Sequence, residues 1–430
     1  MVFFFFFGNF KGEVMQKVEV AIGKRELTSS TKKIILALQH MIAMFGATVL
    51  VPLITGFDVG TSLVCAGIGT LIFHLCTKGK VPVFLGSSFA FIPLIQYVNE
   101  TYGSLRYAQG GIVVAGFIYV ILSFLVKKVG SEKFEKYLPA QVVGPMIIVI
   151  GLNLVPNAIN MASQNFYIAG VTLALALGLS NFAKGFAKQL SIIISVVVGY
   201  FLSYEFNLID TQAIKTAQII QMPKIQLPIF NLGAVLVMAP VVIAVFMEHI
   251  GDITTNSAVV GKNFLKDPGL NRTLLGDGLA TMFAGLVGGP ANTTYGENTG
   301  VLAITKNYDP SILRLAAVFA ICLGCMGKVG GFLQTIPACV MGGISVMLFS
   351  MIAIIGVRTI KTASIQGKMH FNLKNIIIMA VIIVIGLGSH VGINISLPIT
   401  KTVQIGGLSL AALTGLILNA ILEKIVEKNL

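Results

Sequence analysis

The sequence predicts an all-α polytopic membrane protein with fourteen transmembrane segments arranged as two inverted repeats of seven. Charged residues make up 11% of the 430 residues, against roughly 25% in an ordinary soluble domain. Hydrophobic residues make up 55%, and the mean hydropathy is +0.88. Apolar runs also recur from end to end. At about 20 residues per span plus short loops, this length allows up to about 14 helices.

The formal net charge of +13 is not the pattern of a nucleic-acid-binding surface. Such a surface needs Lys and Arg gathered on one face, whereas here they form short clusters between apolar runs. The five cysteines lie in apolar surroundings, and Cys322 and Cys325 form an isolated CxxC without a second Cys pair. We therefore expect buried free thiols, no metal site and no cofactor.

Apolar runs bounded by charges, Gly or Pro give the order of the spans. They place spans at 34–54, 58–77, 83–97, 107–127, 138–155, 166–182, 190–208, 231–250, 272–288, 294–305, 311–327, 335–357, 374–390 and 405–422. Residues 1–33 precede them as a cytoplasmic tail, because the run of Phe in Met1–Phe10 lacks the basic n-region of a secretory signal. Met15 is an alternative start.

Lys and Arg are distributed unequally between the two sides of this arrangement. With a cytoplasmic N-terminus, 25 of the 30 basic residues face the cytoplasm, as expected from the positive-inside rule. One span more or fewer would destroy this bias. The sequence thus predicts a multi-pass protein of the cell inner (plasma) membrane with both termini cytoplasmic, its surface in contact with the lipid bilayer.

Two of the spans contain too many helix-breaking residues to be continuous helices. Pro82–Pro93 includes Gly86, Ser87 and Ser88, and Gly288–Gly300 includes Pro290 among further Gly, Asn and Thr residues. Such segments free backbone polar groups that lipid cannot satisfy, so they must be buried in protein or line a cavity. The alternative is a loop between two shorter helices, which would disturb the charge bias.

Matching spacings indicate an internal repeat. Ser88 follows His40 of the Gln39-His40 pair by 48 residues, and Glu297 follows His249 of the Glu248-His249 pair by 48 residues. The repeats cover 34–208 and 231–422, and because each holds seven spans, the second is inverted relative to the first. Paired broken helices in inverted repeats are typical of secondary transporters with a site near the bilayer midplane.

Most of the 17 acidic residues lie in predicted loops or at span ends, and the exceptions are Glu248, Asp252, Asp277 and Glu297. An ionised carboxylate at that depth costs roughly 2.5 to 3.5 kcal/mol or more, so it is tolerated toward a cavity or when protonated. Glu248 and Asp252 are four residues apart and share one helix face, while Glu297 lies in the second broken span. We expect these three acids to converge where the broken segments meet.

Plainer interpretations are open for several of these residues. Glu248 and Asp252 fit a solvated helix end, and Asp277 fits an ion pair with Arg272 near the cytoplasmic interface. His249 points about 100° away from Glu248 and suits packing or hydrogen bonding better than ligand binding. Gln39 and His40 fit a role in locking the first span against another helix.

Four motifs in order resemble the nucleobase-ascorbate transporter family, the uracil and xanthine permeases. Glu297-Asn298-Thr299-Gly300 followed by Thr305-Lys306 is similar to the family signature, and Gly86–Phe91, Gln39-His40 and Glu248-His249 are similar to motifs of its uracil permease branch. The resemblance covers nearly all of the chain from about Lys24 onward.

The resemblance implies a core domain from spans 1–4 and 8–11 and a gate domain from spans 5–7 and 12–14 that contributes to homodimer contacts. It also implies short strand-like segments in the broken spans. Carried over, Glu248 and Glu297 would hold a pyrimidine ring, with groups near Phe89, Tyr295 and Gly296 completing the site. Supporting positions are Gln39, His40, Ser88, Asn298 and Asp277.

One position departs from the best-described bacterial uracil permease, in which the residue four after the first Glu is His. Here it is Asp252, as in relatives that carry purines or urate. The signature begins with Glu297, however, where xanthine and urate carriers usually have Gln, and this favours uracil. A symporter of xanthine or another purine nucleobase is the alternative.

The chemistry of uracil fits this set of residues. Its flat neutral ring carries two N–H donors and two carbonyl acceptors, which match carboxylates and backbone N–H groups respectively. Accumulation of a neutral ring needs a driving ion, and the Glu248–Asp252 pair, two like charges one turn apart, is suited to share a proton. The resulting expectation is a uracil–proton symporter, with Asp252 and Glu248 in proton coupling.

Two other classes are disfavoured by the residues. An inorganic anion carrier of the same architecture would not need Glu248, Asp252 and Glu297 in its site. A membrane-embedded aspartyl protease usually has Gly-x-Gly-Asp, but Leu274-Leu275-Gly276 precede Asp277. The sequence therefore predicts a transporter and not an enzyme.

Overall fold

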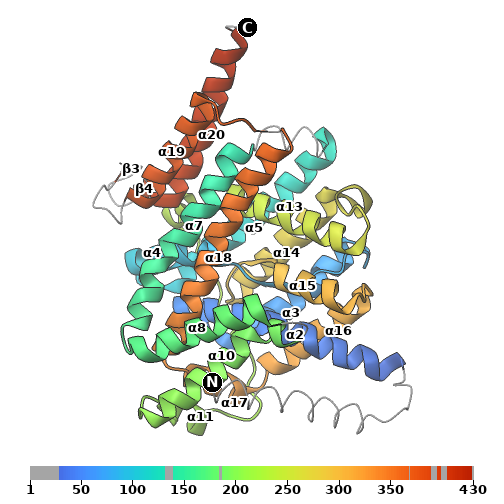
Figure 1. Cartoon of the computed structure of the whole chain (residues 1–430), viewed down its shortest axis with the longest axis vertical. Coiled ribbons are helices and arrows are strands. Elements are labelled where there is room, and N and C mark those ends of the chain that lie inside the picture. Colours follow the sequence, from blue (N-terminus) through green and yellow to red (C-terminus); the bar gives the residue numbers. More distant parts are fainter. Residues whose placement is uncertain are drawn as a thin grey trace.

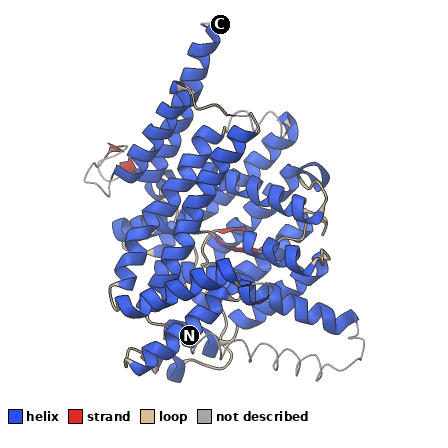
Figure 2. Ribbon diagram, in the orientation of Figure 1, coloured by secondary structure: helices blue, strands red, loops and turns tan. Residues whose placement is uncertain are grey.

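The computed structural model is a helical bundle with one short pair of strands in its interior and a second pair, β3 and β4, at its edge (Figures 1 and 2). It describes residues 29–130, 139–183, 186–367, 369–388, 395–398 and 404–428. Most of the expected cytoplasmic tail, residues 1–28, and the basic positions Lys133, Lys136, Lys184, Lys368 and Lys401 lie outside this set.

The first half of the chain alternates long helices with one interrupted segment. Its elements are α2 (Ser29–Thr55), α3 (Val59–Cys76), β1 (Leu85–Ser87), the 3₁₀-helix η1 (Phe89–Phe91), α4 (Ile92–Tyr102), α5 (Leu105–Val129), α7 (Ala140–Ala162), α8 (Phe166–Phe182), α9 (Phe186–Gln189), α10 (Ser191–Glu205) and α11 (Gln212–Thr216).

The second half has the same kind of succession. Its elements are α12 (Leu232–Met238), α13 (Val241–Val260), η2 (Leu265–Gly269), α14 (Leu270–Val287), β2 (Asn292–Thr294), α15 (Gly296–Thr305), α16 (Pro310–Gly324), α17 (Gly327–Gln334), α18 (Ala338–Ile365), α19 (Leu373–Leu387), β3 (Ser396–Pro398), β4 (Gln404–Gly406) and α20 (Gly407–Lys428).

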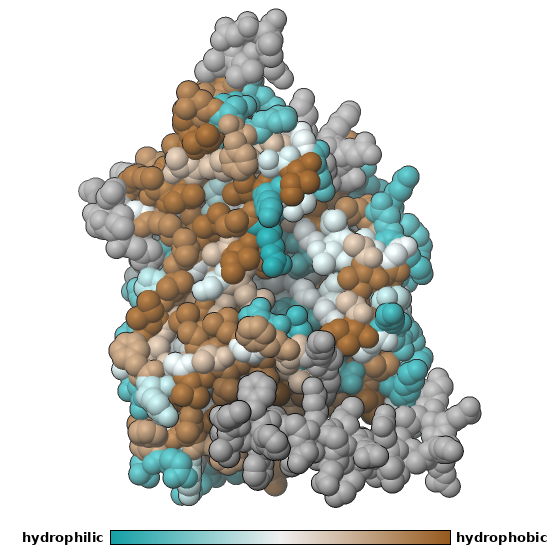
Figure 3. All heavy atoms as spheres, viewed as in Figure 1, coloured by the Kyte–Doolittle hydropathy of each residue, from teal (hydrophilic) through white to brown (hydrophobic). Residues whose placement is uncertain are grey.

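Several of these helices are long and apolar enough to cross a bilayer. By length and composition the described residues contain 6 such helices, or 7 if α16 and α17, bent by 78° at their junction, count as one span. Shorter apolar helices, among them α8, α10 and α19, accompany them. Large apolar side chains such as Phe117 and Phe201 are exposed, and apolar residues cover much of the face in Figure 3. The chain is a multi-pass membrane protein.

One predicted boundary is wrong. The eighth span was expected to end at residue 250, but α13 continues to Val260. The polar residues that follow Gly251 remain within the helix, where their hydroxyls donate to carbonyls one turn back, Thr254 to Ile250 at 2.7 Å and Ser257 to Ile253 at 2.7 Å. Side-chain hydrogen bonds of this kind satisfy hydroxyl groups without water.

Small residues let helices from opposite halves of the chain pack with their backbones close together. A Cβ on Gly116 of α5 would lie 2.7 Å from the carbonyl oxygen of Gly278 in α14, and one on Gly278 would lie 2.9 Å from that of Gly116. Gly60 of α3 and Gly324 of α16 approach in the same reciprocal way, with 2.6 Å in each direction. Close backbone packing through small residues is a common basis of helix association in membranes.

The two interrupted segments meet as an antiparallel pair near the middle of the molecule (Figure 2). Leu85 pairs with Thr294 and Ser87 with Asn292. The ladder is extended by Ser88 N–H donating to Ala291 at 2.8 Å and by Tyr295 N–H donating to Phe84 at 3.0 Å. Each broken segment thus satisfies the backbone groups of the other, which lipid could not do.

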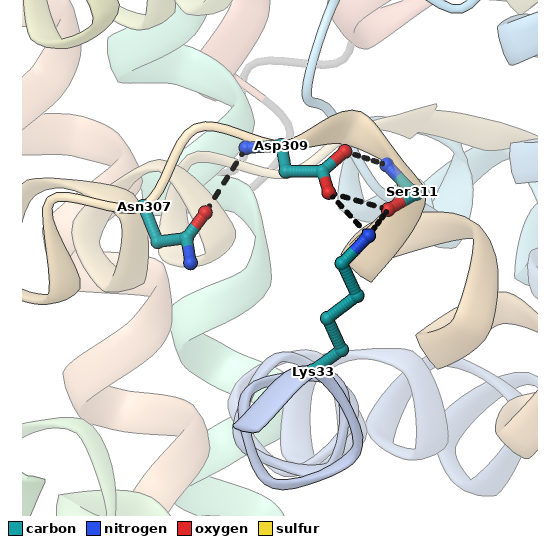
Figure 4. A network of polar contacts seen from close by, with 4 residues as sticks. All are labelled: Lys33, Asn307, Asp309 and Ser311. Atoms are coloured by element: carbon teal, nitrogen blue, oxygen red, sulfur yellow. Dashed lines mark hydrogen bonds and ion pairs between the residues drawn. The ribbon is translucent and has the colours of Figure 1, made fainter. Parts of the chain in front are cut away.

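A polar contact ties the beginning of α2 to the beginning of α16 (Figure 4). The Asp309 carboxylate caps α16 by accepting from Ser311 N–H at 2.9 Å and from the Ser311 hydroxyl at 2.7 Å. Lys33 Nζ lies 2.9 Å from the same carboxylate. Partial burial alone would raise the pKa of Asp309, but hydrogen bonds from Ser311 and Lys33 outweigh it and lower the pKa to about 2.

Replacing Gly116 by Val should destabilise the protein, because the new side chain would have to displace the backbone of α14. Overpacking of this kind costs about 1 to 3 kcal/mol, so the thermal midpoint of the detergent-solubilised protein should fall by several degrees. Gly170→Val on α8 is the matched control, since a Cβ there meets nothing within 4 Å. Equal midpoints for both variants would contradict the close packing of α5 and α14.

The Asp309 contact should contribute stability that depends on pH. A carboxylate with a lowered pKa stabilises the fold above its unfolded pKa of about 3.9 and loses that contribution as the pH falls toward 2. Asp309→Asn keeps a capping oxygen but removes the charge. Its stability deficit should be below about 1 kcal/mol, because Asp309 and Lys33 are partly exposed. The deficit, measured by thermal unfolding from pH 6 downward, should shrink below pH 4, and a constant deficit would show that the charge contributes nothing.

Candidate functional site

Helix α13 presents two acidic side chains from its middle. Glu248 and Asp252 lie one turn apart, well inside the helix Val241–Val260, and both are half-buried. The alternative of a solvated helix end therefore does not apply to them. Their placement on one face follows from the 3.6-residue period.

Two helix N-termini meet at the strand pair. The 3₁₀-helix η1 begins directly after β1, and α15 begins directly after β2. Neither Ser88 nor Tyr295, the residues at the N-cap positions, makes a side-chain capping bond. The first N–H groups of both helices are not used by helical hydrogen bonds, so they are available as donors at this point.

The acids of α13 approach β2 and the start of α15. The hydroxyl of Thr294 donates to Oδ2 of Asp252 at 2.8 Å, and a Cβ on Gly296 would lie 3.7 Å from Oδ1 of the same residue. Asp252 thus lies beside the first turn of α15, where Glu297 is half-buried and Gly296 is exposed.

Tyr295 lies between the strands and α2. Its hydroxyl donates to the carbonyl oxygen of Ser87 at 2.9 Å. Its ring lies against Gly86, where a side chain would collide with it. The phenol therefore braces β1 against β2, and its polar group is already engaged.

Phe89 follows the first strand and meets a helix of the second half. Its ring packs edge-on against Phe349 of α18, with ring centroids 6.2 Å apart at an interplanar angle of 76°. Phe89 is half-buried, while Phe349 is buried completely. This aromatic contact joins η1 to α18 beside the strand pair.

Asn298 links the signature segment to the first helix. Its amide nitrogen lies 3.2 Å from Nδ1 of His40 and donates to the carbonyl oxygen of the same residue at 2.9 Å. His40 and Asn298 are both fully buried. Among the described residues, Oε1 of Gln39 and Oγ of Ser88 are buried without a hydrogen-bond partner. His40 therefore locks α2 against α15, as one sequence interpretation held.

A neighbouring face of α13 carries a second polar pair. Nδ1 of His249 lies 3.3 Å from Oδ2 of Asp277 on α14, and both side chains are completely buried. The His249 ring also packs edge-on against Phe73, with centroids 6.4 Å apart. Arg272 does not pair with Asp277 but donates to the carbonyl oxygen of Cys76 at 3.1 Å. The ion-pair interpretation of Asp277 and Arg272 is therefore wrong.

Three polar residues of the site were not singled out from the sequence. Thr294 holds Asp252, Asn256 donates to Pro82 at 3.0 Å and to Thr299 at 3.2 Å, and Thr70 accepts from Leu85 N–H at 2.9 Å. The sequence could have indicated these residues, because a polar residue at span depth beside a broken segment must find a hydrogen-bond partner within the protein. Which partner it finds depends on the tertiary fold.

The arrangement is suited to binding a small polar molecule. Within the described residues no group of three or more His, Cys, Asp or Glu side chains is arranged to hold a metal ion. The site combines carboxylate acceptors from α13 and α15 with N–H donors at two helix starts. A planar polar molecule with alternating donors and acceptors is complementary to such a set.

Comparison with known proteins identifies the family. Residues 31–395 match the Permease family, that of the xanthine and uracil permeases. The chain is 44% identical to a probable uracil permease of Haemophilus influenzae, over 93% of this chain and 96% of that protein. It is 39% identical to the uracil permease of Bacillus subtilis (96% and 98%) and 37% identical to that of Escherichia coli K12 (94% and 94%).

Two solved structures share the fold at low sequence identity. The transmembrane domain of the cyanobacterial bicarbonate transporter BicA matches with a TM-score of 0.58 at 17% identity, over 92% of this chain and 99% of that one. SLC26A9 matches with a TM-score of 0.66 at 12% identity, over 90% and 64%. With a family match that spans most of the chain and relatives of 37 to 44% identity, this protein belongs to the uracil/xanthine permease family of membrane transporters.

Proposed function

We propose that this protein imports uracil across the cytoplasmic membrane as a secondary active transporter driven by protons. The relatives named above are uracil permeases. The observation that carries the proposal is the approach of Asp252 to β2 and the start of α15, through the Asp252–Thr294 hydrogen bond of 2.8 Å, with Glu248 one turn away on the same helix.

Each group of the site is assigned one part of the ring. Glu248 and Glu297 accept hydrogen bonds from the two ring N–H groups, and backbone N–H groups near Phe89 and Gly296 donate to the carbonyl oxygens. Tyr295, which directly follows β2, holds β1 in place through the hydrogen bond from its hydroxyl to the carbonyl oxygen of Ser87. Gln39, His40, Ser88, Asn298 and Asp277 support these residues without touching the substrate.

Proton coupling is assigned to the Glu248–Asp252 pair. Two carboxylates one helical turn apart repel each other when both are ionised, and a shared proton removes that repulsion. Proton binding and substrate binding then favour the same state of the site. The purine alternative is not favoured by the relatives, and the first position of the signature, Glu297, distinguishes the two cases below.

For the architecture we propose fourteen spans in two inverted repeats, 34–208 and 231–422. The core domain comprises spans 1–4 and 8–11, and the gate domain comprises spans 5–7 and 12–14. The contact of α3 with α16 resembles that of α5 with α14, each through a reciprocal pair of glycines, as a repeat predicts. Cytoplasmic termini, residence in the inner membrane and a homodimer joined through the gate complete the proposal.

Glu297→Gln should weaken uracil binding tenfold or more. The amide offers one acceptor and a competing NH₂ group where the carboxylate offers two acceptors, and loss of a charged acceptor costs about 1.5 to 3 kcal/mol. Calorimetry on the purified protein measures the effect, with Glu100→Gln at the exposed end of α4 as the matched control. Unchanged affinity would remove Glu297 from the site, whereas a gain in xanthine binding would mark it as the position that separates the two substrates.

Asp252→Asn should impair accumulation more than equilibrium binding. The amide oxygen can still accept from Thr294, so the local geometry is kept while a proton site is lost. Uptake into proteoliposomes under an imposed proton or sodium gradient, beside binding by calorimetry, separates the two effects, and Asp210→Asn near α11 is the exposed control. Proton-driven accumulation at the normal level by Asp252→Asn would reject this residue as the coupling group, and uptake driven only by sodium would reject proton symport.

A further inference from the structure

A cavity of about 600 Å³ lies between α2 and α10, closed by α17 and the first turns of α18. It is separate from the candidate site, because none of the acidic residues lines it. On the α2 side the wall includes Phe45 and Gly46, and on the α10 side it includes Ile193 and Tyr200. Its volume is in the range of small-molecule pockets, about 300 to 1,000 Å³.

The lining excludes a polar occupant. Apart from the hydroxyls of Tyr200 and Tyr204, every lining side chain is apolar. The Tyr200 hydroxyl is already hydrogen-bonded to Thr335 at 3.1 Å, and its ring packs on Phe332 with centroids 5.2 Å apart. Buried water needs two to four polar partners, which this cavity does not supply.

The cavity continues onto an apolar surface. Val197, Phe201 and Tyr204 line its α10 side and are exposed by 46%, 68% and 67% respectively. In a membrane protein, exposed apolar residues of a span face lipid tails, and Tyr near a helix end is typical of the membrane interface. The surface that lipid covers and the wall of the cavity are therefore one continuous surface.

From this continuity we propose that the α2–α10 cavity binds an acyl chain of a membrane lipid. The acyl chain enters between exposed side chains of α10 and lies against Phe45 of α2. Beside the cavity α2 approaches α10 closely at Gly46, where a Cβ would lie 2.8 Å from Ile192. The binding of lipid here does not depend on which substrate is transported.

The sequence contains no Trp, so one introduced Trp is a clean fluorescent reporter. Phe45→Trp in vesicles of phosphatidylcholine with brominated acyl chains should be quenched nearly as strongly as Phe117→Trp, which is 52% exposed on α5. Phe264→Trp is the shielded control, because Phe264 is buried in a cluster with Phe73 and Ile253 that contains no residue of α10. Quenching of Phe45→Trp no greater than that of the shielded control would overturn the proposal.

A substitution that fills part of the cavity tests whether the acyl chain lies in the cavity itself. In the Phe45→Trp background in detergent, titration with the brominated lipid should give saturable quenching that the unbrominated lipid reverses. Ile193→Phe narrows the cavity and should weaken this binding several-fold, whereas Ile194→Phe, on the same helix but outside the lining, should not. Equal quenching curves for the two variants would place the lipid elsewhere and reject the proposal.

The competing occupant is the Phe-rich beginning of this chain, which has five consecutive Phe residues at positions 3–7. A chain that begins at Met15 should keep the quenching of Phe45→Trp unchanged if a lipid fills the cavity. Shielding of the reporter in the full chain that disappears on truncation would identify the N-terminal segment as the occupant and overturn the proposal.

Discussion

The structure depends on one constraint, that backbone polar groups inside a bilayer must be satisfied by the protein itself. Pro, Gly and Asn interrupt the helices around Gly86 and Pro290, and the freed N–H and C=O groups have no water to bind. The antiparallel pairing of β1 with β2 answers this need. It requires two segments more than 200 residues apart in sequence to meet, and it brings two helix starts to the same point.

Close packing of the surrounding helices follows from the same requirement. The strand pair in the middle of the molecule packs against α2, α3, α13 and α14, and small residues let α16 pack closely on α3 and α5 on α14. The reciprocal approach of Gly116 and Gly278 places α5 directly on α14, and α14 then supplies Asp277 behind α13. Polar ties at the edge, such as His40 with Asn298, orient α15 against α2.

Helix α13 separates two kinds of acidic chemistry by its period. Glu248 and Asp252 are half-buried and turn toward the strand pair, while His249, one residue on, turns toward α14 and pairs with Asp277 out of reach of solvent. A carboxylate that must bind substrate or a proton needs access to solvent. A carboxylate that only holds a helix in place does not. The proposed transport chemistry therefore belongs to the first face and the support of the helix to the second.

The sequence by itself determined the membrane class, the two interrupted segments, the acidic residues at span depth and the family. These follow from local composition, spacing and motifs, which need no knowledge of distant neighbours. The end of α13, the strand register and the partners of Asp252 and Asp277 were decided only by the tertiary structure. Each depends on which groups lie nearby in space, as when Asn298 finds His40 across 258 residues of sequence. Hydropathy indicates that a buried polar group needs a partner, but only the packing of the helices selects it.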